Sequence, residues 1–186
     1  MKLIVLDRDG VINQDSDAYV KSVDEWIPLA GSIDAIARLT QAGHLVAVAT
    51  NQSGLARGYF EQQDLDQMHE KMHQLVAAAG GKIDYLSYCP HGPDDGCRCR
   101  KPAAGMIEEI LLDLDNPEVT ERWIVGDSLR DLQAGDSQGL RSALVRTGKG
   151  AKTLAEKSDQ LPTGTLVFDD LADFTDQLIS DSLSDS

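Results

Sequence analysis

Two aspartates separated by one residue follow a short apolar segment near the N-terminus. Residues 2–6 are largely branched and apolar, and Asp7, Asp9 and Gly10 come directly after them. This pattern is typical of a buried parallel strand, and ligands of open α/β sheets bind at the carboxyl ends of such strands. Two carboxylates this close favour a bound cation, because like charges otherwise repel each other. A plain turn rich in aspartate is the alternative for this segment taken alone.

Other predicted strands end in residues suited to the same chemistry. A strand over residues 45–49 leads into the hydroxyl and amide groups of residues 50–53, and a later strand ends at Asp127. Lys101 follows a further strand after a loop. Because parallel strands share one carboxyl edge, we expect these groups to converge. Carboxylates are ligands that Mg²⁺ prefers, and the donors and Lys101 would surround a phosphoryl group.

This set of groups suits phosphoryl transfer to an aspartate. Asp7 would attack phosphorus, and Asp9, two residues later, would move the proton. A nucleotide triphosphate site is disfavoured, because Gly148-Lys149-Gly150 lacks the upstream glycine and the Ser or Thr of a P-loop.

All three cysteines of the chain fall within eleven residues, together with one histidine: Cys89, His91, Cys97 and Cys99. Three thiolates and one imidazole form a closed tetrahedral set for Zn²⁺, and with no position left for water the ion would be structural. A loop of free thiols is the alternative. The zinc would fix Arg100 and Lys101, and basic residues here in an acidic chain favour phosphate binding over simple surface exposure for Arg100.

The predicted helix over residues 65–79 carries His69 and His73 four residues apart. This spacing is compatible with a metal pair, but no acidic or cysteine partner stands nearby in the required pattern. We therefore expect two histidines on the helix surface.

Length, net charge and the lengths of the apolar segments limit the classes of protein to which the chain can belong. The chain has 186 residues and a net charge of −14, which fits one domain and argues against a nucleic-acid partner. No apolar segment is long enough to span a bilayer or to serve as a signal peptide, which predicts a cytoplasmic protein. We expect a single domain over residues 1–179, a flexible acidic tail over 180–186, and a monomer.

Strands and helices alternate along the chain, which predicts an α/β fold with a parallel central sheet and right-handed crossovers. Residues 13–30 are polar and are expected to form a loop over the strand ends. The remaining expected elements are strands over 83–88, 141–145 and 165–168, and helices from about 32 to 43, about 103 to 114, from 128, and about 171 to 179.

The ordered set Asp7-x-Asp9-Gly10, Thr50, Lys101 and Gly126-Asp127-x-x-x-Asp131 resembles the four motifs of the haloacid dehalogenase-like (HAD) phosphatases. The resemblance covers roughly residues 3–147. It implies a Rossmannoid three-layer fold with no large cap domain, here with a loop stapled by zinc.

The resemblance also assigns roles within the site. It implies that Asp7 is the nucleophile that becomes phosphorylated and that Asp9 is the general acid and then base. Thr50 and Lys101 would steady the phosphoryl group. Mg²⁺ would bind the Asp7 carboxylate, the Asp9 carbonyl and Asp127, whereas Asp131 would order the loop rather than touch the metal.

Further segments narrow the resemblance to the histidinol-phosphate phosphatase-like subfamily, and within it to phosphatases of heptose bisphosphates. These are residues 7–13, 19–20, 50–58, 99–102 and 144–150, with the cysteine loop. The resemblance implies Mg²⁺-dependent removal of the C7 phosphate of D-glycero-D-manno-heptose 1,7-bisphosphate for lipopolysaccharide synthesis. The implied substrate-binding residues are Asp7, Arg8, Asp9, Asp15, Ser16, Asp17, Ala18, Tyr19, Thr50, Asn51, Gln52, Ser53, Arg57, Arg100 and Lys101.

Two departures and three alternatives accompany this interpretation. The segment between His91 and Cys97 is shorter than in some relatives, and Ser128 stands where some carry lysine, which puts a charged contact there in doubt. A surface salt bridge is the alternative for Arg57. A histidinol-phosphate phosphatase is the nearest alternative function, and a non-catalytic, zinc-stapled binding module is a remote one.

Overall fold

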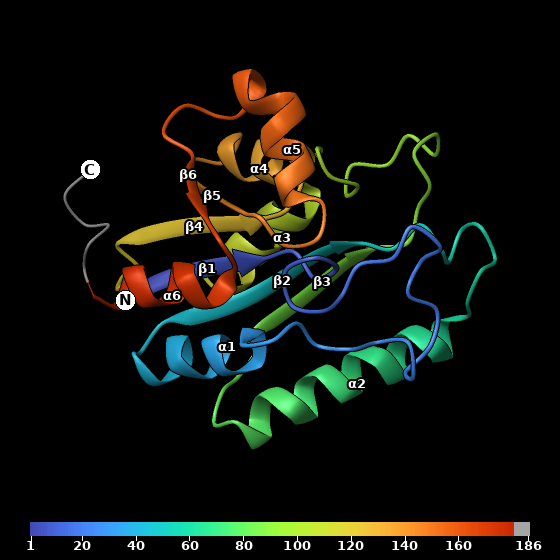
Figure 1. Cartoon of the computed structure of the whole chain (residues 1–186), viewed down its shortest axis with the longest axis horizontal. Coiled ribbons are helices and arrows are strands. Elements are labelled where there is room, and N and C mark those ends of the chain that lie inside the picture. The colour runs from blue at the N-terminus through green and yellow to red at the C-terminus, as the bar shows by residue number, and fades with distance from the viewer. Residues whose placement is uncertain (181–186) are drawn as a thin grey trace.

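The computed structural model describes residues 1–180, so six of the seven residues of the expected tail lie outside the described part. A six-stranded sheet forms the centre, with the order β3-β2-β1-β4-β5-β6 and every neighbouring pair parallel (Figure 1). The expected parallel α/β class is confirmed. The strands are β1 (Lys2–Leu6), β2 (Leu45–Asn51), β3 (Tyr85–Cys89), β4 (Glu121–Gly126), β5 (Arg141–Val145) and β6 (Leu166–Phe168).

Helices pack on both faces of this sheet and give the fold three layers (Figure 1). One face carries α1 (Ser32–Gln41), α2 (Gln62–Ala78) and α6 (Leu171–Ile179). The other carries α3 (Gly105–Asp113) and α4 (Leu129–Asp136). A further helix, α5 (Gly150–Lys157), follows β5 and continues into a 3₁₀ turn, Ser158–Gln160. None of the helices within residues 1–180 combines the length and apolar character that a membrane crossing requires.

The alternation of side chains along β1 explains why it is central. Ile4 and Leu6 belong to the core under α1, α2 and α6, whereas Leu3 and Val5 belong to the core under α3 and α4. All four are at most 1% exposed, as expected of a strand covered on both faces. The first residue after β1 therefore emerges at the carboxyl edge of a buried sheet.

Several element boundaries differ from the expectation. β2 continues to Asn51, because Thr50 and Asn51 still pair with Tyr88 and Cys89 of β3. Helix α5 was not predicted. Its Thr153 hydroxyl donates to the carbonyl of Asp127, a tertiary contact that local periodicity does not reveal.

The expected loop over residues 13–30 has no helix or strand of its own, but it is anchored to the core. Trp26 is fully buried, and Lys71 of α2 donates to the carbonyls of Val23 and Trp26 at 2.9 and 2.6 Å. This anchoring holds the loop over the strand ends.

Helix α4 is held on the sheet through Leu132, which is fully buried, and we predict that Leu132→Ala lowers the free energy of unfolding by about 2–5 kcal/mol. The matched control is Leu112→Ala on α3, because Leu112 is 81% exposed and its truncation should change stability by less than about 0.5 kcal/mol. Urea unfolding followed by circular dichroism measures both. Equal losses in the two variants would contradict the packing described here.

Candidate active site

A cavity of about 310 Å³ opens at the carboxyl edge of the sheet and collects the groups predicted to converge there. Its walls come from the end of β2, from the segments that follow β1, β2, β3 and β5, and from the start of α4 with the two residues before it. The lining residues are Asp7, Asp9, Asp15, Ser16, Asp17, Tyr19, Val20, Asn51, Gln52, Ser53, Arg57, Arg100, Lys101, Asp127, Ser128, Arg130, Asp131 and Lys149.

The Lys101 ammonium lies at the floor of this cavity between two carboxylates. Its Nζ is 2.9 Å from Oδ1 of Asp7 and 2.8 Å from Oδ1 of Asp131, and it donates to the carbonyl of Ala49 at 2.6 Å. Lys101 is only 1% exposed. Burial alone would lower the pKa of Lys101, but Asp131 and Asp7 raise it, so the side chain stays charged.

The backbone of Lys101 is fixed by the end of β2. The Asn51 side chain accepts from the Lys101 N–H at 3.0 Å and donates to the Lys101 carbonyl at 3.2 Å. The Asn51 side-chain amide thus pairs with both backbone polar groups of Lys101, as a neighbouring strand would in a sheet. This contact places Lys101, which comes from the loop after β3, opposite the end of β1.

Three carboxylates crowd together beside this ammonium. Asp7, Asp127 and Asp131 offer oxygens that all lie within 4.8 Å of one another. Burial and repulsion from Asp131 raise the pKa of Asp7 to about 6, and burial with repulsion from Asp7 and Asp131 raises the pKa of Asp127. Oxygen donors that repel one another in a buried cluster fit a hard divalent cation such as Mg²⁺.

Asp131 is engaged by the protein through both carboxylate oxygens. Oδ2 accepts from the backbone N–H of Ser128 at 3.1 Å and closes the first turn of α4, while Oδ1 faces Lys101. Asp131 thus connects the start of α4 to Lys101, and its predicted role in ordering the loop stays a prediction.

Asp9 is held as a carboxylate by three donors. Oδ1 accepts from Arg8 and Asn13, each at 2.8 Å, and Oδ2 accepts from Gln52 at 3.0 Å. Burial alone would raise the pKa of Asp9, but Arg8 and these hydrogen bonds lower it below its usual value. Gln52 also donates to the Thr50 hydroxyl at 2.9 Å, so Thr50 lies behind Gln52 and does not line the cavity.

Arg8 and His69 occupy places that local sequence did not suggest. The Arg8 side chain is fully buried and does not line the cavity, so its guanidinium serves Asp9 and a substrate contact would have to come from its backbone. The prediction that His69 lies on the helix surface is wrong. His69 is 6% exposed and its Nε2 is 3.1 Å from Arg8. Burial and the neighbouring Arg8 lower the pKa of His69 to about 3, so the neutral ring accepts from Arg8. His73 is exposed, as expected.

Three arginines lie at the rim of the cavity, namely Arg57, Arg100 and Arg130. Burial and the proximity of Arg130 and Arg57 lower the pKa of Arg100. Arg130 and Lys149 were not predicted to belong to the site. Arg130 stands between Asp127 and Asp131 in the chain, and its positive charge there was the available signal.

The loop after β1 forms the opposite wall. Tyr19 has a left-handed backbone with φ of 67°, and its ring lies 4.9 Å from that of Tyr59, with the Arg57 guanidinium 5.8 Å from the Tyr19 ring. Asp15 is 3.8 Å from the Lys149 ammonium. Ala18, which was predicted to bind substrate, is exposed and does not line the cavity.

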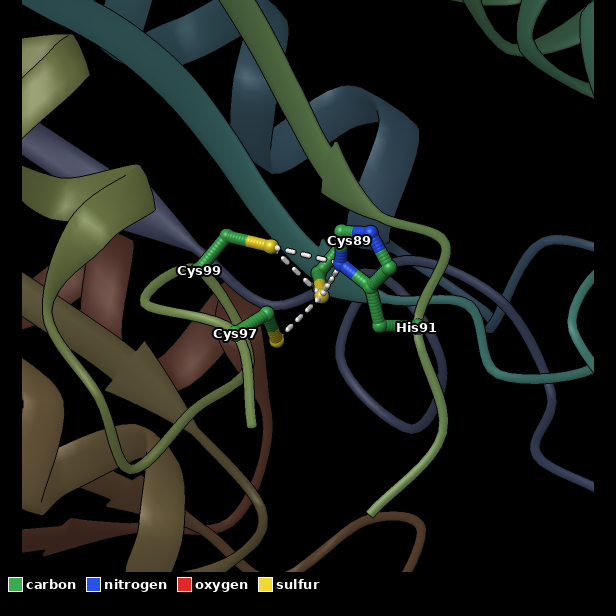
Figure 2. A group of neighbouring side chains, drawn as sticks. All are labelled: Cys89, His91, Cys97 and Cys99. Carbon is green, nitrogen blue, oxygen red and sulfur yellow. Dashed lines mark hydrogen bonds between the residues drawn. The ribbon is translucent and has the colours of Figure 1, made fainter. Parts of the chain in front are cut away.

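The four predicted zinc ligands gather at the last residue of β3 and in the loop that follows it, and Figure 2 shows them pointing toward one another. The Sγ atoms of Cys89 and Cys99 are 2.8 Å apart, those of Cys89 and Cys97 are 3.7 Å apart, and His91 Nδ1 lies 3.2 Å from Cys99 Sγ. Three sulfurs and one nitrogen this close match the donor set of a structural zinc site.

Comparison with known proteins decides the family. A D-glycero-β-D-manno-heptose-1,7-bisphosphate 7-phosphatase from Neisseria meningitidis is 59% identical over 182 residues, 98% of this chain and 97% of the relative. The corresponding protein from Pseudomonas aeruginosa is 55% identical over 170 residues, 91% of this chain and 93% of the relative. The chain belongs to this family.

A member of the family from Bordetella bronchiseptica has a crystal structure in complex with magnesium and phosphate. It is 56% identical to this chain and superimposes with a TM-score of 0.92 over 97% of this chain and 99% of that one. A HAD-hydrolase-like family model also matches residues 98–174, which include Lys101 and Asp127. The fold is therefore that of the HAD-like phosphatases.

The raised pKa of Asp7 predicts a pH-dependent stability in Mg²⁺-free buffer. Because the folded protein holds the Asp7 proton up to about pH 6, above the ordinary pKa of 3.8, stability falls as pH rises between these values. At about pH 7.5, Asp7→Asn should therefore be more stable than the parent by at most roughly 3 kcal/mol, a difference that shrinks near pH 4. Urea unfolding at both pH values measures this. A less stable Asp7→Asn at about pH 7.5 would contradict it.

Proposed function

We propose that this chain is a phosphatase that removes the C7 phosphate of D-glycero-β-D-manno-heptose 1,7-bisphosphate. The observation that carries the proposal is the convergence of Asp7, Asp9, Lys101 and Asp127 in one cavity. The substrate is supported by the activity for which the relatives at 55–59% identity are named. The product would be the heptose 1-phosphate, an intermediate of lipopolysaccharide synthesis.

Asp7 is proposed as the nucleophile. A carboxylate oxygen of Asp7 forms a bond to phosphorus as the bond from phosphorus to the C7 oxygen breaks, which leaves an aspartyl-phosphate. Lys101, fixed against Asp7 at 2.9 Å, offsets charge on the phosphoryl oxygens and favours the ionised form of Asp7 against the opposing effect of burial. Gln52 and Ser53 of the cavity wall offer further donors, and Thr50 supports Gln52 from behind.

Asp9 is proposed as the proton carrier in both half-reactions. It donates a proton to the C7 oxygen as that oxygen leaves, and later takes a proton from the water that attacks the aspartyl-phosphate. Hydrolysis then releases inorganic phosphate and restores both aspartates. Arg8, Asn13 and Gln52 hold Asp9 ionised, so the negative charge of the arriving phosphate must raise its pKa before the first transfer.

Mg²⁺ is the proposed cofactor. The Asp7 and Asp127 carboxylates would hold it, with the Asp9 carbonyl as the further predicted ligand, and its magnesium-bound relative supports this assignment. When bound, the ion screens Asp7 from the anionic phosphate and offsets charge in the transition state.

The three rim arginines are proposed to receive the second phosphate of the substrate. Arg57, Arg100 and Arg130 concentrate positive charge at the mouth of the cavity in a chain whose net charge is −14. A bisphosphate reaching from Asp7 to the rim would meet cations at both ends. A monophosphate would leave the rim unused, which favours the bisphosphate over histidinol phosphate.

Zn²⁺ is proposed as a structural ion held by Cys89, His91, Cys97 and Cys99. The loop that these residues close delivers Arg100 and Lys101, and little secondary structure supports it otherwise. Residues 1–179 are proposed to act as one phosphatase domain, because a single sheet runs through them, and the chain is proposed to act as a monomer. A cytoplasmic location is proposed because the grouped thiols suit a reducing compartment.

We predict that Cys99→Ser lowers zinc content and activity together, because loss of one thiolate loosens the loop that carries Lys101. Zinc by mass spectrometry and phosphate release measure the two properties in one preparation. Asp94→Asn is the control, since Asp94 is exposed on the same loop and is not a proposed ligand. Full activity of Cys99→Ser without zinc would refute the stapling role.

Phosphate release with Mg²⁺ present tests the function directly, from heptose 1,7-bisphosphate and from histidinol phosphate side by side. We expect a strong preference for the bisphosphate with the C1 phosphate left intact, and no turnover by Asp7→Asn although that variant keeps its zinc. A preference for histidinol phosphate would overturn the substrate. Turnover by Asp7→Asn would overturn the mechanism.

A further inference from the structure

The turn between β5 and α5 touches three separate parts of the cavity wall. The Thr147 hydroxyl donates to the carbonyl of Gly10 at 2.7 Å, and the Lys149 N–H donates to Oδ2 of Asp127 at 2.9 Å. The Lys149 ammonium also lies 3.8 Å from Asp15. Residues 147–149 therefore connect the loop after Asp9, the proposed metal ligand and the loop expected to contact substrate.

The turn between β5 and α5 holds the Asp127 carboxylate, and α5 holds the Asp127 backbone. Oδ2 accepts from Lys149, and the Asp127 carbonyl accepts from the Thr153 hydroxyl of α5 at 2.9 Å. Ser128 donates to Oδ1 at 3.3 Å. Asp127 is 2% exposed, so these groups leave its carboxylate little freedom to rotate.

Two glycines allow the backbone to approach this carboxylate from two chain segments. Gly148 and Gly10 have φ of 57° and 86°, and a Cβ atom on either would lie within 3.0 Å of Asp127 Oδ2. A Cβ on Gly148 would also lie 2.5 Å from the Gly10 Cα. A side chain at position 148 must therefore displace Asp127, the Gly10 loop or both.

We propose that residues 147–149, together with Thr153, form a positioning device that fixes the Asp127 carboxylate relative to the Asp7 loop and so sets the affinity for Mg²⁺. Outer contacts of this kind orient metal ligands, and their loss commonly weakens metal binding by about 10-fold to 100-fold. The inference rests on the proposed function in one respect, namely that the ion binds at Asp127.

The test measures metal binding without substrate, using Mg²⁺ alone in isothermal titration calorimetry. Gly148→Ala should weaken Mg²⁺ binding by about 10-fold or more, with zinc content unchanged. The matched control is Gly164→Ala. Gly164 also has a left-handed backbone, with φ of 82°, but its Cβ would meet nothing within 4 Å, so only backbone strain is introduced. That control should bind Mg²⁺ as the parent does.

A second pair of variants serves if Gly148→Ala does not fold. Thr153→Val removes the hydroxyl that donates to Asp127 at nearly constant shape and should weaken Mg²⁺ binding several-fold, to about 10-fold, whereas Thr153→Ser keeps the donor and should not. Parent-like affinity in a folded Gly148→Ala, or equal affinity in both Thr153 variants, overturns the inference.

Failure of the proposed function gives a different result. A parent protein that binds Mg²⁺ but does not release phosphate from the heptose bisphosphate contradicts the proposed substrate, while the Gly148→Ala comparison still decides the positioning role. A parent protein that does not bind Mg²⁺ overturns both.

Discussion

The whole site depends on one buried group of charges, the Lys101 ammonium between Asp7 and Asp131. Lys101 is 1% exposed and Asp131 is 1% exposed, so each charge loses its hydration and is stable only while its partners stay in place. One ammonium does not neutralise three carboxylates, since Asp127 lies within 4.8 Å of the other two. Burial and the remaining repulsion together raise the pKa of Asp7, and the same repulsion makes the cavity suitable for a divalent cation.

Rigid supports on both sides keep these charges together. The β1 strand, buried from Leu3 to Leu6, is followed directly by Asp7. The Asn51 amide pairs with the backbone of Lys101, which lies at the end of the Cys/His loop. On the opposite side the 147–149 turn closes on Asp127. A parallel sheet supplies only the approximate convergence of strand ends, and these local contacts supply the ångström-level positions that catalysis requires.

Sequence predicted the parts of this arrangement that local pattern encodes. The apolar run before Asp7 indicated a buried strand, and the spacing from Cys89 to Cys99 indicated a cluster of four metal ligands. The same reasoning placed His69 on a surface and missed α5. His69 is buried because Arg8, 61 residues earlier, needs an acceptor beside Asp9, and α5 is fixed by the contact between Thr153 and Asp127. Both depend on residues distant in sequence, which periodicity does not report.

Two cavity-lining residues that the sequence did not predict, Arg130 and Lys149, also depend on tertiary structure. Their positions show how an acidic chain can bind an anion. Arg130 and Lys149 are exposed and look like ordinary surface charges in sequence, yet both face the cavity beside Arg57 and Arg100. With a net charge of −14, the long-range field of the protein disfavours a bisphosphate. Attraction therefore has to arise within a few ångströms of the ligand, where screening by salt is weakest. Basic residues from three separate loops and from the first turn of α4 supply it, and the ammonium at the floor of the cavity continues it inward to Asp7, the proposed nucleophile.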